Sequence, residues 1–420
     1  MDRPLPLFAF LLFLSPLGCS NLEPVSEDLS VKRRVINLPM TQWSEIARQD
    51  IAILMPRHDT IRIAMSDETP AGPIFPERWY EEVKDAFELT AVQDAFEAES
   101  WLDDWQIVSI RIAPCSPLGK QAGAHATMYC WPEVRLVWQP IIYDFFIGWT
   151  TVPAYADDRA IHALYRTFPD KNEISARTAI GEVRRYLDAG LQPPSELTST
   201  FTTLRNEAIS QLLGSTLQLR GPTISAAELN QLSMRVETQM EAANHVAFTD
   251  RLRAFVAAFC PPTSLHALTS FSLPEGRDPA GIDTWVFLAF DADGGELQQT
   301  ELTIADPVTG ETLFSFGMSE TVAAAAADEV VTDAMAADAE LEEQLSPRLV
   351  QSSADRESVA SLVNDPNQTL VPNSGCASCH SLNEFTFDFH NLSYLQEMDM
   401  TISDRVVNDV EHDLNWLNQR

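Results

Sequence analysis

Apolar side chains recur along this chain with two different periods, which together indicate a mixed α and β structure. Apolar and polar residues alternate, as they do in half-buried strands, at 60–65, 108–112 and 134–138. Between the first two of these stretches, residues 77–98 place apolar side chains near helical spacing and predict a helix.

The middle of the chain has a helical pattern. Asn172 and Ser195 are suitable helix N-caps, and Gly190 with the Pro193-Pro194 pair separates the two helices that they would start. Residues 225–228, Ser-Ala-Ala-Glu, match a capping box, and the apolar face that follows predicts one helix ending near Phe259.

The last third begins with strands and ends with a helix. Residues 284–318 read as a three-stranded meander with turns at 293–295 and 308–311. The acidic, alanine-rich residues 321–345 predict a helix, and so do the apolar positions of 404–417. We therefore expect an α+β main domain at 41–345, with antiparallel strands and a helical middle section. A linker at 346–375 and a short, mainly helical and extended C-terminal segment at 376–420 follow it.

The chain is strongly acidic. Its 420 residues include 61 Asp and Glu against 28 Lys and Arg, a net charge of −33. Such a surface repels phosphate backbones and anionic lipid, so nucleic acid is excluded as a partner, whereas a basic protein would be attracted.

The first 18 residues are typical of an export signal. An apolar run from Leu5 to Leu14 follows Arg3 and is too short to span a bilayer. Gly18-Cys19-Ser20 then resembles the lipobox of bacterial lipoproteins, which implies that Cys19 carries lipid, that 19–40 form a tether, and that the protein is a periplasmic or outer-membrane lipoprotein. A plain secretory signal is the alternative. No later run of 18 apolar residues exists in the sequence, so lipid would be the only membrane attachment.

Export makes a disulfide expected among the six cysteines. With Cys19 assigned to lipid and Cys376 and Cys379 to the motif described next, three remain. Cys115 and Cys130 end the two predicted strands that frame one loop, so a bond between them is the preferred pairing, with Cys260 as the competitor.

Residues 376–380, Cys-Ala-Ser-Cys-His, carry the clearest chemistry in the sequence. Two thiols three residues apart can each add to a vinyl group of one porphyrin, and the histidine that follows can bind the iron. A zinc site or a redox disulfide is the alternative, but zinc needs four ligands and no second Cys-x-x-Cys occurs in the sequence.

The motif resembles the attachment site of the c-type cytochromes, over five residues and, loosely, the rest of the tail. The resemblance implies one covalent haem c held by Cys376 and Cys379, with His380 as the proximal iron ligand. It departs from a free-standing cytochrome domain because only 40 residues follow His380. We therefore expect residues upstream of the motif to supply part of the haem pocket.

The second axial ligand stays open between several residues. His390 lies ten residues beyond His380, and an extended chain of that length reaches about 30 Å, enough to cross to the other face of the iron. Met398 and Met400 are the methionine candidates, His412 lies in the predicted last helix, and an upstream residue such as His125 is a further choice.

These observations favour a monohaem c-type cytochrome lipoprotein that transfers electrons in the bacterial cell envelope, with a redox partner protein that is basic. One alternative is a haem enzyme or sensor with an open sixth position for peroxide or a small gas. Another is a surface lipoprotein whose main domain binds a partner and whose haem is accessory. The sequence favours electron transfer over catalysis, because it contains no hydrolase, phosphate-loop or zinc-protease motif.

Overall fold

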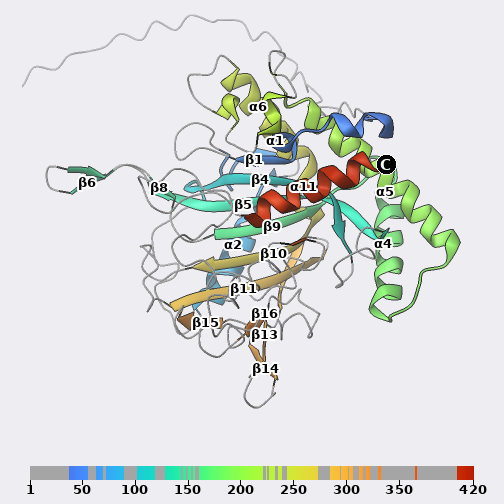
Figure 1. Cartoon of the computed structure of the whole chain (residues 1–420). Helices are drawn as coiled ribbons and strands as arrows, with labels where there is room; N and C mark the ends of the chain where they lie inside the picture. The colour runs from blue at the N-terminus through green and yellow to red at the C-terminus, as the bar shows by residue number, and fades with distance from the viewer. Residues whose placement is uncertain are drawn as a thin grey trace, which may run out of the picture. The chain divides into compact units, whose positions relative to one another are not determined.

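The computed structural model describes most of the main domain and the last helix. The described residues are 37–54, 63–69, 72–88, 102–118, 128–142, 145–147, 150–152, 155–156, 160–220, 224, 227–231, 235–238, 244–272, 284–293, 295–300, 302–305, 312–315, 318–321, 330–332, 365–366 and 404–420. They form an α+β fold, as the sequence predicts, built on one large antiparallel sheet (Figure 1).

The large sheet has the strand order β1-β4-β5-β9-β10-β11-β12, with β15 also on β11 and β8 on β5. The strands in it pair antiparallel throughout the described residues. Its strands are β1 (Ala52–Leu54), β4 (Trp105–Pro117), β5 (Cys130–Ile142), β8 (Tyr155–Ala156), β9 (Ala160–Arg166), β10 (Leu265–Ser272), β11 (Thr284–Asp293), β12 (Glu296–Thr300) and β15 (Met318–Thr321).

Smaller sheets pair β2 (Glu68–Thr69) with β3 (Gly72–Pro73), β6 (Phe145–Ile147) with β7 (Thr150–Val152), and β13 (Leu302–Ala305) with β14 (Thr312–Ser315) and β16 (Val330–Thr332). The helices are α1 (Arg48–Ile51), α2 (Glu77–Glu88), α4 (Glu173–Asp188), α5 (Ser195–Leu217), α6 (His245–Phe259) and α11 (Asp404–Asn418). The described residues also form the 3₁₀ helices η1 (Met40–Glu45), η2 (Glu228–Asn230), η3 (Val236–Thr238) and η4 (Pro262–Ser264).

The two faces of the large sheet differ in chemistry. One face carries a continuous row of paired apolar side chains, which are Ile110, Leu136, Ala163, Leu268 and Phe290. The neighbouring residues point the other way and make a polar face with the row Arg111, Arg135, Leu164, Ala267 and Asp291. We call this second side the polar sheet face.

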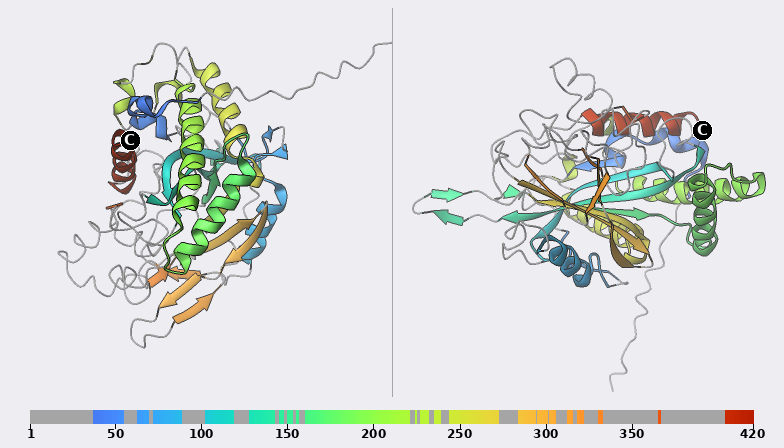
Figure 2. Two further views of the ribbon diagram at one scale, coloured as in Figure 1. Left: turned by 90° about the vertical axis from the view of Figure 1, so that its right-hand side faces the viewer. Right: turned by 90° about the horizontal axis from the view of Figure 1, so that it is seen from below.

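Helices α2 and α11 lie on opposite sides of the sheet (Figure 2). Trp79 of α2 is fully buried and donates its indole N–H to the Gly295 carbonyl over 2.8 Å, and Phe75 just before α2 packs edge-on against Trp138 of the apolar face. Helix α11 instead lies across the polar sheet face, where its Asp413 pairs with Arg111. A separate small core joins α4 and α5 to Trp131.

Several predicted boundaries are confirmed. Helix α4 follows Asn172 as its N-cap, Gly190 takes the left-handed φ of 67° between α4 and α5, and α11 covers the predicted 404–417. The meander begins as expected with β11 and β12, but the second strand ends at Thr300, and β13 starts a different sheet. Ser195 is the first residue of α5 rather than its N-cap, which is Pro194.

Three predicted elements are wrong in part. The single helix from Ser225 to Phe259 is interrupted, because η2 ends at extended Gln231, and α6 begins only at His245, after Asn244. Buried ion pairs of Arg235 and Glu237 occupy the stretch between, so tertiary contacts override the helical period there. Within the predicted helix 321–345, residues 330–332 are a strand on β13. In the predicted strand 60–65, residues 60–62 lie outside the described residues, and the rest forms an isolated bridge from Ala64 to Gln106, flanked by backbone hydrogen bonds of Ile63 and Met65 with β4, rather than a strand.

Candidate functional site

Residues 376–403 of the predicted haem segment lie outside the described residues. This applies to Cys376, Cys379 and His380, to the candidate ligands His390, Met398 and Met400, and to Cys19 and His125. The donor set itself fits a c-type haem, since it consists of two thiols at thioether spacing and an adjoining imidazole. The described structure bears on the C-terminal end of this segment, residues 404–420, and on the domain to which it is joined.

Helix α11 fixes the far end of the tail to the main domain. Trp416 is buried and stacks on Trp43 of η1, with ring centroids 6.1 Å apart and planes 20° apart. Val406, Val410 and Leu417 lie on the same side of the helix and are also buried. The last helix of the predicted haem segment is therefore part of the core that also holds the sheet.

Two ion pairs orient this helix. Asp413 accepts a hydrogen bond from Arg111 of β4, and both side chains are largely buried, with 8% and 15% exposed. Arg111 also donates to the carbonyls of Ile51 at 3.0 Å and Asp409 at 3.1 Å, so its guanidinium joins β4, α1 and α11. Glu411 pairs with Arg48 of α1 on the helix flank. Burial raises the pKa of Asp413 although Arg111 acts to lower it.

His412, the one candidate ligand that the structure describes, lies on α11 between these two anchoring carboxylates. Its side chain is half-buried, and as a cation it would lower the pKa of the neighbouring Asp413. Because Cys376, Cys379 and His380 lie outside the described residues, the role of His412 as a ligand stays a prediction.

The polar sheet face holds a cluster that the sequence analysis missed. Glu133 of β5 accepts from Arg135 Nε at 2.7 Å and from His266 Nε2 at 3.2 Å, and Arg135 also donates to the Ser116 hydroxyl at 3.1 Å. Burial works to raise the pKa of Glu133, but Arg135 and the hydrogen bond from His266 outweigh it and hold that pKa well below its usual range.

His266 is neutral at pH 7 in this environment. Burial, together with the nearby Arg166, lowers its pKa from 6.5 to about 4, and the contact with Glu133 only partly offsets this. The Glu133–His266 contact is thus a hydrogen bond from a neutral imidazole rather than an ion pair. The sequence did contain a signal for this cluster, since charged residues occupy alternate positions of strongly apolar strands.

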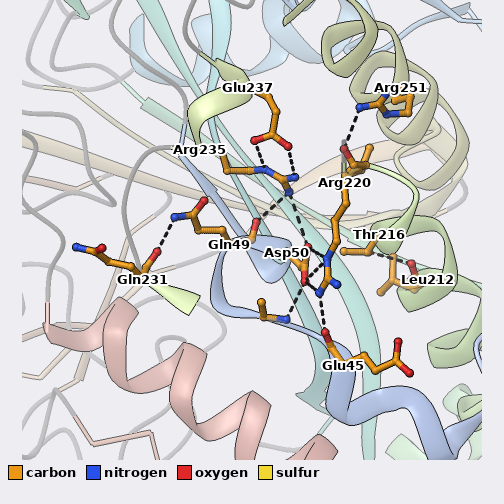
Figure 3. Close-up of polar contacts among 12 residues, drawn as sticks. Glu45, Gln49, Asp50, Leu212, Thr216, Arg220, Gln231, Arg235, Glu237 and Arg251 are labelled. Carbon is orange, nitrogen blue, oxygen red and sulfur yellow. Dashed lines mark hydrogen bonds and ion pairs between the residues drawn. The ribbon is translucent and has the colours of Figure 1, made fainter. Parts of the chain in front are cut away.

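A second buried network joins three segments distant in sequence (Figure 3). Asp50 accepts from Arg220 Nε at 3.0 Å and from the Ala47 amide at 2.7 Å, and Arg235 Nη2 contacts Glu237 at 2.7 Å. Asp50, Arg235 and Glu237 have no exposed side-chain surface. Two guanidiniums face two carboxylates, and each has a protein partner, which is the arrangement of a structural network rather than of a reactive site.

The structure joins Cys115 and Cys130, the pair preferred from the sequence, in a disulfide with Cα atoms 4.9 Å apart. Cys260 is free and buried, and burial raises the pKa of its thiol well above the usual value. A thiol with this pKa is a poor nucleophile, so the leftover cysteine has the properties of a core residue.

Within the residues that the structure describes, no group of three or more His, Cys, Asp or Glu side chains is arranged to hold a metal ion. Over that same portion of the chain, no helix has the length and apolar character needed to cross a membrane. No family model matches the sequence, no curated protein is significantly similar to it, and no solved structure matches the fold. The function must therefore be inferred from the chain's own residues.

Proposed function

We propose that the protein is a monohaem c-type cytochrome lipoprotein that binds haem and transfers electrons in the bacterial cell envelope. The observation that carries this is the sequence Cys376-Ala-Ser-Cys379-His380. Its two thiols would hold the porphyrin covalently, and the His380 imidazole would bind the iron. When bound, haem supplies a site that takes up and releases one electron.

The disulfide supports the export that this function requires. Disulfides persist outside the reducing cytoplasm, and c-type haem is also attached outside the cytoplasm. Cys115 and Cys130 form such a bond between β4 and β5, and both residues are buried in the domain core. This agrees with a signal peptide at 1–18 and a lipidated Cys19, which remain proposals.

The main domain would hold the haem segment at a defined place. Residues 404–420 are fixed by Trp416 and Asp413, so the tail is tied down 24 residues after His380. Attachment at that point would keep the haem tethered to the main domain when a redox partner docks. A net charge of −33 would attract a basic redox protein.

The test is expression of the full chain with and without a cytochrome c maturation system. We expect a haem absorption spectrum that survives denaturation only with maturation, and its loss in Cys376→Ala/Cys379→Ala. Cys260→Ala is the matched control, because it removes a thiol outside the motif and should leave haem attachment intact. Haem that washes out of the unfolded wild-type chain would contradict the proposal.

The same material tests the second axial ligand. If His390, Met398 or Met400 binds the iron, the reduced protein should bind carbon monoxide poorly, and replacing that one residue by Ala should open the site. Strong carbon monoxide binding by the unchanged protein would contradict a six-coordinate electron carrier.

A further inference from the structure

Arg205 of α5 lies against the disulfide that joins β4 to β5. Its Nη1 is 4.0 Å from Cys130 Sγ, within reach of a hydrogen bond to sulfur, and the same nitrogen donates to the Met128 carbonyl at 3.1 Å. Arg205 and Cys130 are both almost completely buried, with 3% and 0% of their surface exposed. The guanidinium therefore acts on this sulfur with little screening by bulk water.

The described partners of Arg205 are all neutral. Its other hydrogen bonds go to the amide oxygen of Asn206, at 3.2 Å from Nε and 3.1 Å from Nη2. Within the described residues, no Asp or Glu side chain forms an ion pair with Arg205. Four other arginines with little exposed surface each have a carboxylate, in the pairs Arg111–Asp413, Arg135–Glu133, Arg220–Asp50 and Arg235–Glu237.

The surroundings of Arg205 make its positive charge costly. Burial, and after it the nearby Arg420, lower the pKa of Arg205 to about 10. The centre of the Trp416 ring lies 5.7 Å from the guanidinium carbon, and such a contact offsets only part of the cost. A negative charge on Cys130 would serve as a counterion for this guanidinium.

Reduction of the disulfide creates that charge. A thiolate of a dithiol reductant attacks Cys115 Sγ, the bond between the two protein sulfurs breaks, and Cys130 leaves as a thiolate. The second thiol of the reductant then attacks the reductant's own sulfur in the mixed disulfide. This closes the reductant's disulfide and releases Cys115, which takes up the proton of that second thiol. Two electrons pass to the protein, and Arg205 favours Cys130 as the leaving group because it stabilises its thiolate.

The backbone around Cys115 suits the attacked position. The pairing of β4 with β5 is interrupted there, between the pairs Ala113–Glu133 and Ser116–Trp131. Such a bulge leaves residues out of the ladder of hydrogen bonds, and bulges are frequent next to reactive sites. Cys115 also keeps 6% of its surface exposed, so it is the more accessible half of the disulfide.

We propose that Cys115–Cys130 is a redox-active disulfide, reduced in the folded protein by an exported protein dithiol, with Arg205 stabilising the Cys130 thiolate. A cation that stabilises the reduced form makes a disulfide more oxidising than one that lacks it. The proposal goes beyond electron transfer by haem and does not depend on it.

The test is equilibration of the full-length protein with oxidised and reduced dithiothreitol at fixed ratios. Acid stops the exchange, and labelling of the unfolded chain followed by peptide mapping reports Cys115 and Cys130 separately from the other cysteines. We expect Arg205→Gln to lower the equilibrium constant for reduction at least about tenfold, because a charge-assisted contact with the thiolate is lost. Arg253→Gln removes an exposed arginine paired with Asp67 and should leave that constant unchanged.

A purely structural role for Arg205 would not change this constant, because a loss of stability common to the oxidised and reduced forms cancels between them. A second measurement needs no variant. If Cys130 is a thiolate, reduction by dithiothreitol releases one proton, and near neutral pH the constant should rise about tenfold per pH unit. A constant that is independent of pH, or one that is unchanged in Arg205→Gln, overturns the proposal. Reduced protein that circular dichroism shows to be unfolded overturns it as well.

Discussion

Trp416, four residues from the C-terminal end of the sequence, stacks on Trp43 at the start of the described domain, with ring centroids 6.1 Å apart. Both rings are buried in the core that holds the sheet. A deletion of residues 346–420 would therefore remove part of the main domain together with the haem motif. Loss of function after that deletion could not be assigned to haem, and the last helix must be kept in any test of the tail.

The stacking predicts a large stability effect at one position of α11. Trp416→Ala should lower the free energy of unfolding by about 3 kcal/mol, since it empties a buried aromatic site. Denaturant unfolding followed by circular dichroism measures this. Asn415→Ala is the neighbouring control, because Asn415 is exposed, and it should change stability by less than about 0.5 kcal/mol. Equal losses for both variants would show that α11 does not pack on the domain.

The Arg111–Asp413 pair predicts a charge effect on the same helix. Asp413→Asn should destabilise the protein by about 3 kcal/mol, because it leaves the Arg111 guanidinium largely buried without its carboxylate. Glu296→Gln removes a carboxylate from the exposed pair with Arg78 and should cost about 0.5 kcal/mol at most. The comparison of the two unfolding midpoints tests whether α11 is held by a buried pair, and a neutral Asp413→Asn would argue against it.

The lowered pKa of His266 predicts how the free energy of unfolding depends on pH. The pKa of His266 is about 4 in the folded protein, against an ordinary value of 6.5 that applies to the unfolded chain. Between pH 4 and pH 6.5 the unfolded chain therefore binds a proton that the folded chain does not. Stability should therefore fall as pH drops from 6.5 to 4, by up to about 3 kcal/mol. The depressed pKa of Glu133 adds a further loss below its ordinary value of 4.5.

His266→Gln keeps an N–H donor for Glu133 but does not titrate. Chemical denaturation at a series of pH values should show a flatter slope between pH 6.5 and 4 for this variant. An identical slope in the variant and the unchanged protein would mean that His266 is not the group responsible.

The thiols can be counted directly. Cys115 and Cys130 are bonded, Cys260 is buried with a raised thiol pKa, and lipid and haem would occupy the other three cysteines. The folded mature protein should not react with a thiol reagent, and the unfolded, unreduced protein should react at one site, which peptide mapping should place at Cys260. Three reactive sites including Cys376 and Cys379 would mean that no thioethers form.

The sequence predicted much of this fold because the relevant signals are local. The alternation in β4 and β5 placed their cysteines at opposite ends of one loop, and the structure bonds them. The apolar face of 404–417 predicted α11 and its inward residues. Neither pattern reveals the partner, so the docking of α11 on Trp43 and Arg111 could not be foreseen from residues more than 300 positions away.

The predictions from the sequence that are wrong have the opposite cause, because long-range contacts decide the structure there. Residues 225–259 have a helical period, but Arg235 and Glu237 are buried in an ion pair with each other and near Asp50, and that long-range network competes with the helix at 235–238. The polar cluster of Glu133, Arg135 and His266 likewise joins two strands that the sequence alone does not pair. The haem motif is the reverse case, since five adjacent residues define its chemistry without any long-range contact.

The most direct test of the central proposal is the mass of the exported protein under denaturing conditions, measured together with haem staining of the same band. We predict that the chain carries the added mass of one haem, bound to the peptide that contains Cys376 and Cys379. We also expect Cys376→Ala/Cys379→Ala to abolish both signals while α11 and the Cys115–Cys130 disulfide stay intact. A stable, exported, disulfide-bonded protein without that mass, produced in cells that mature other c-type cytochromes, would contradict it.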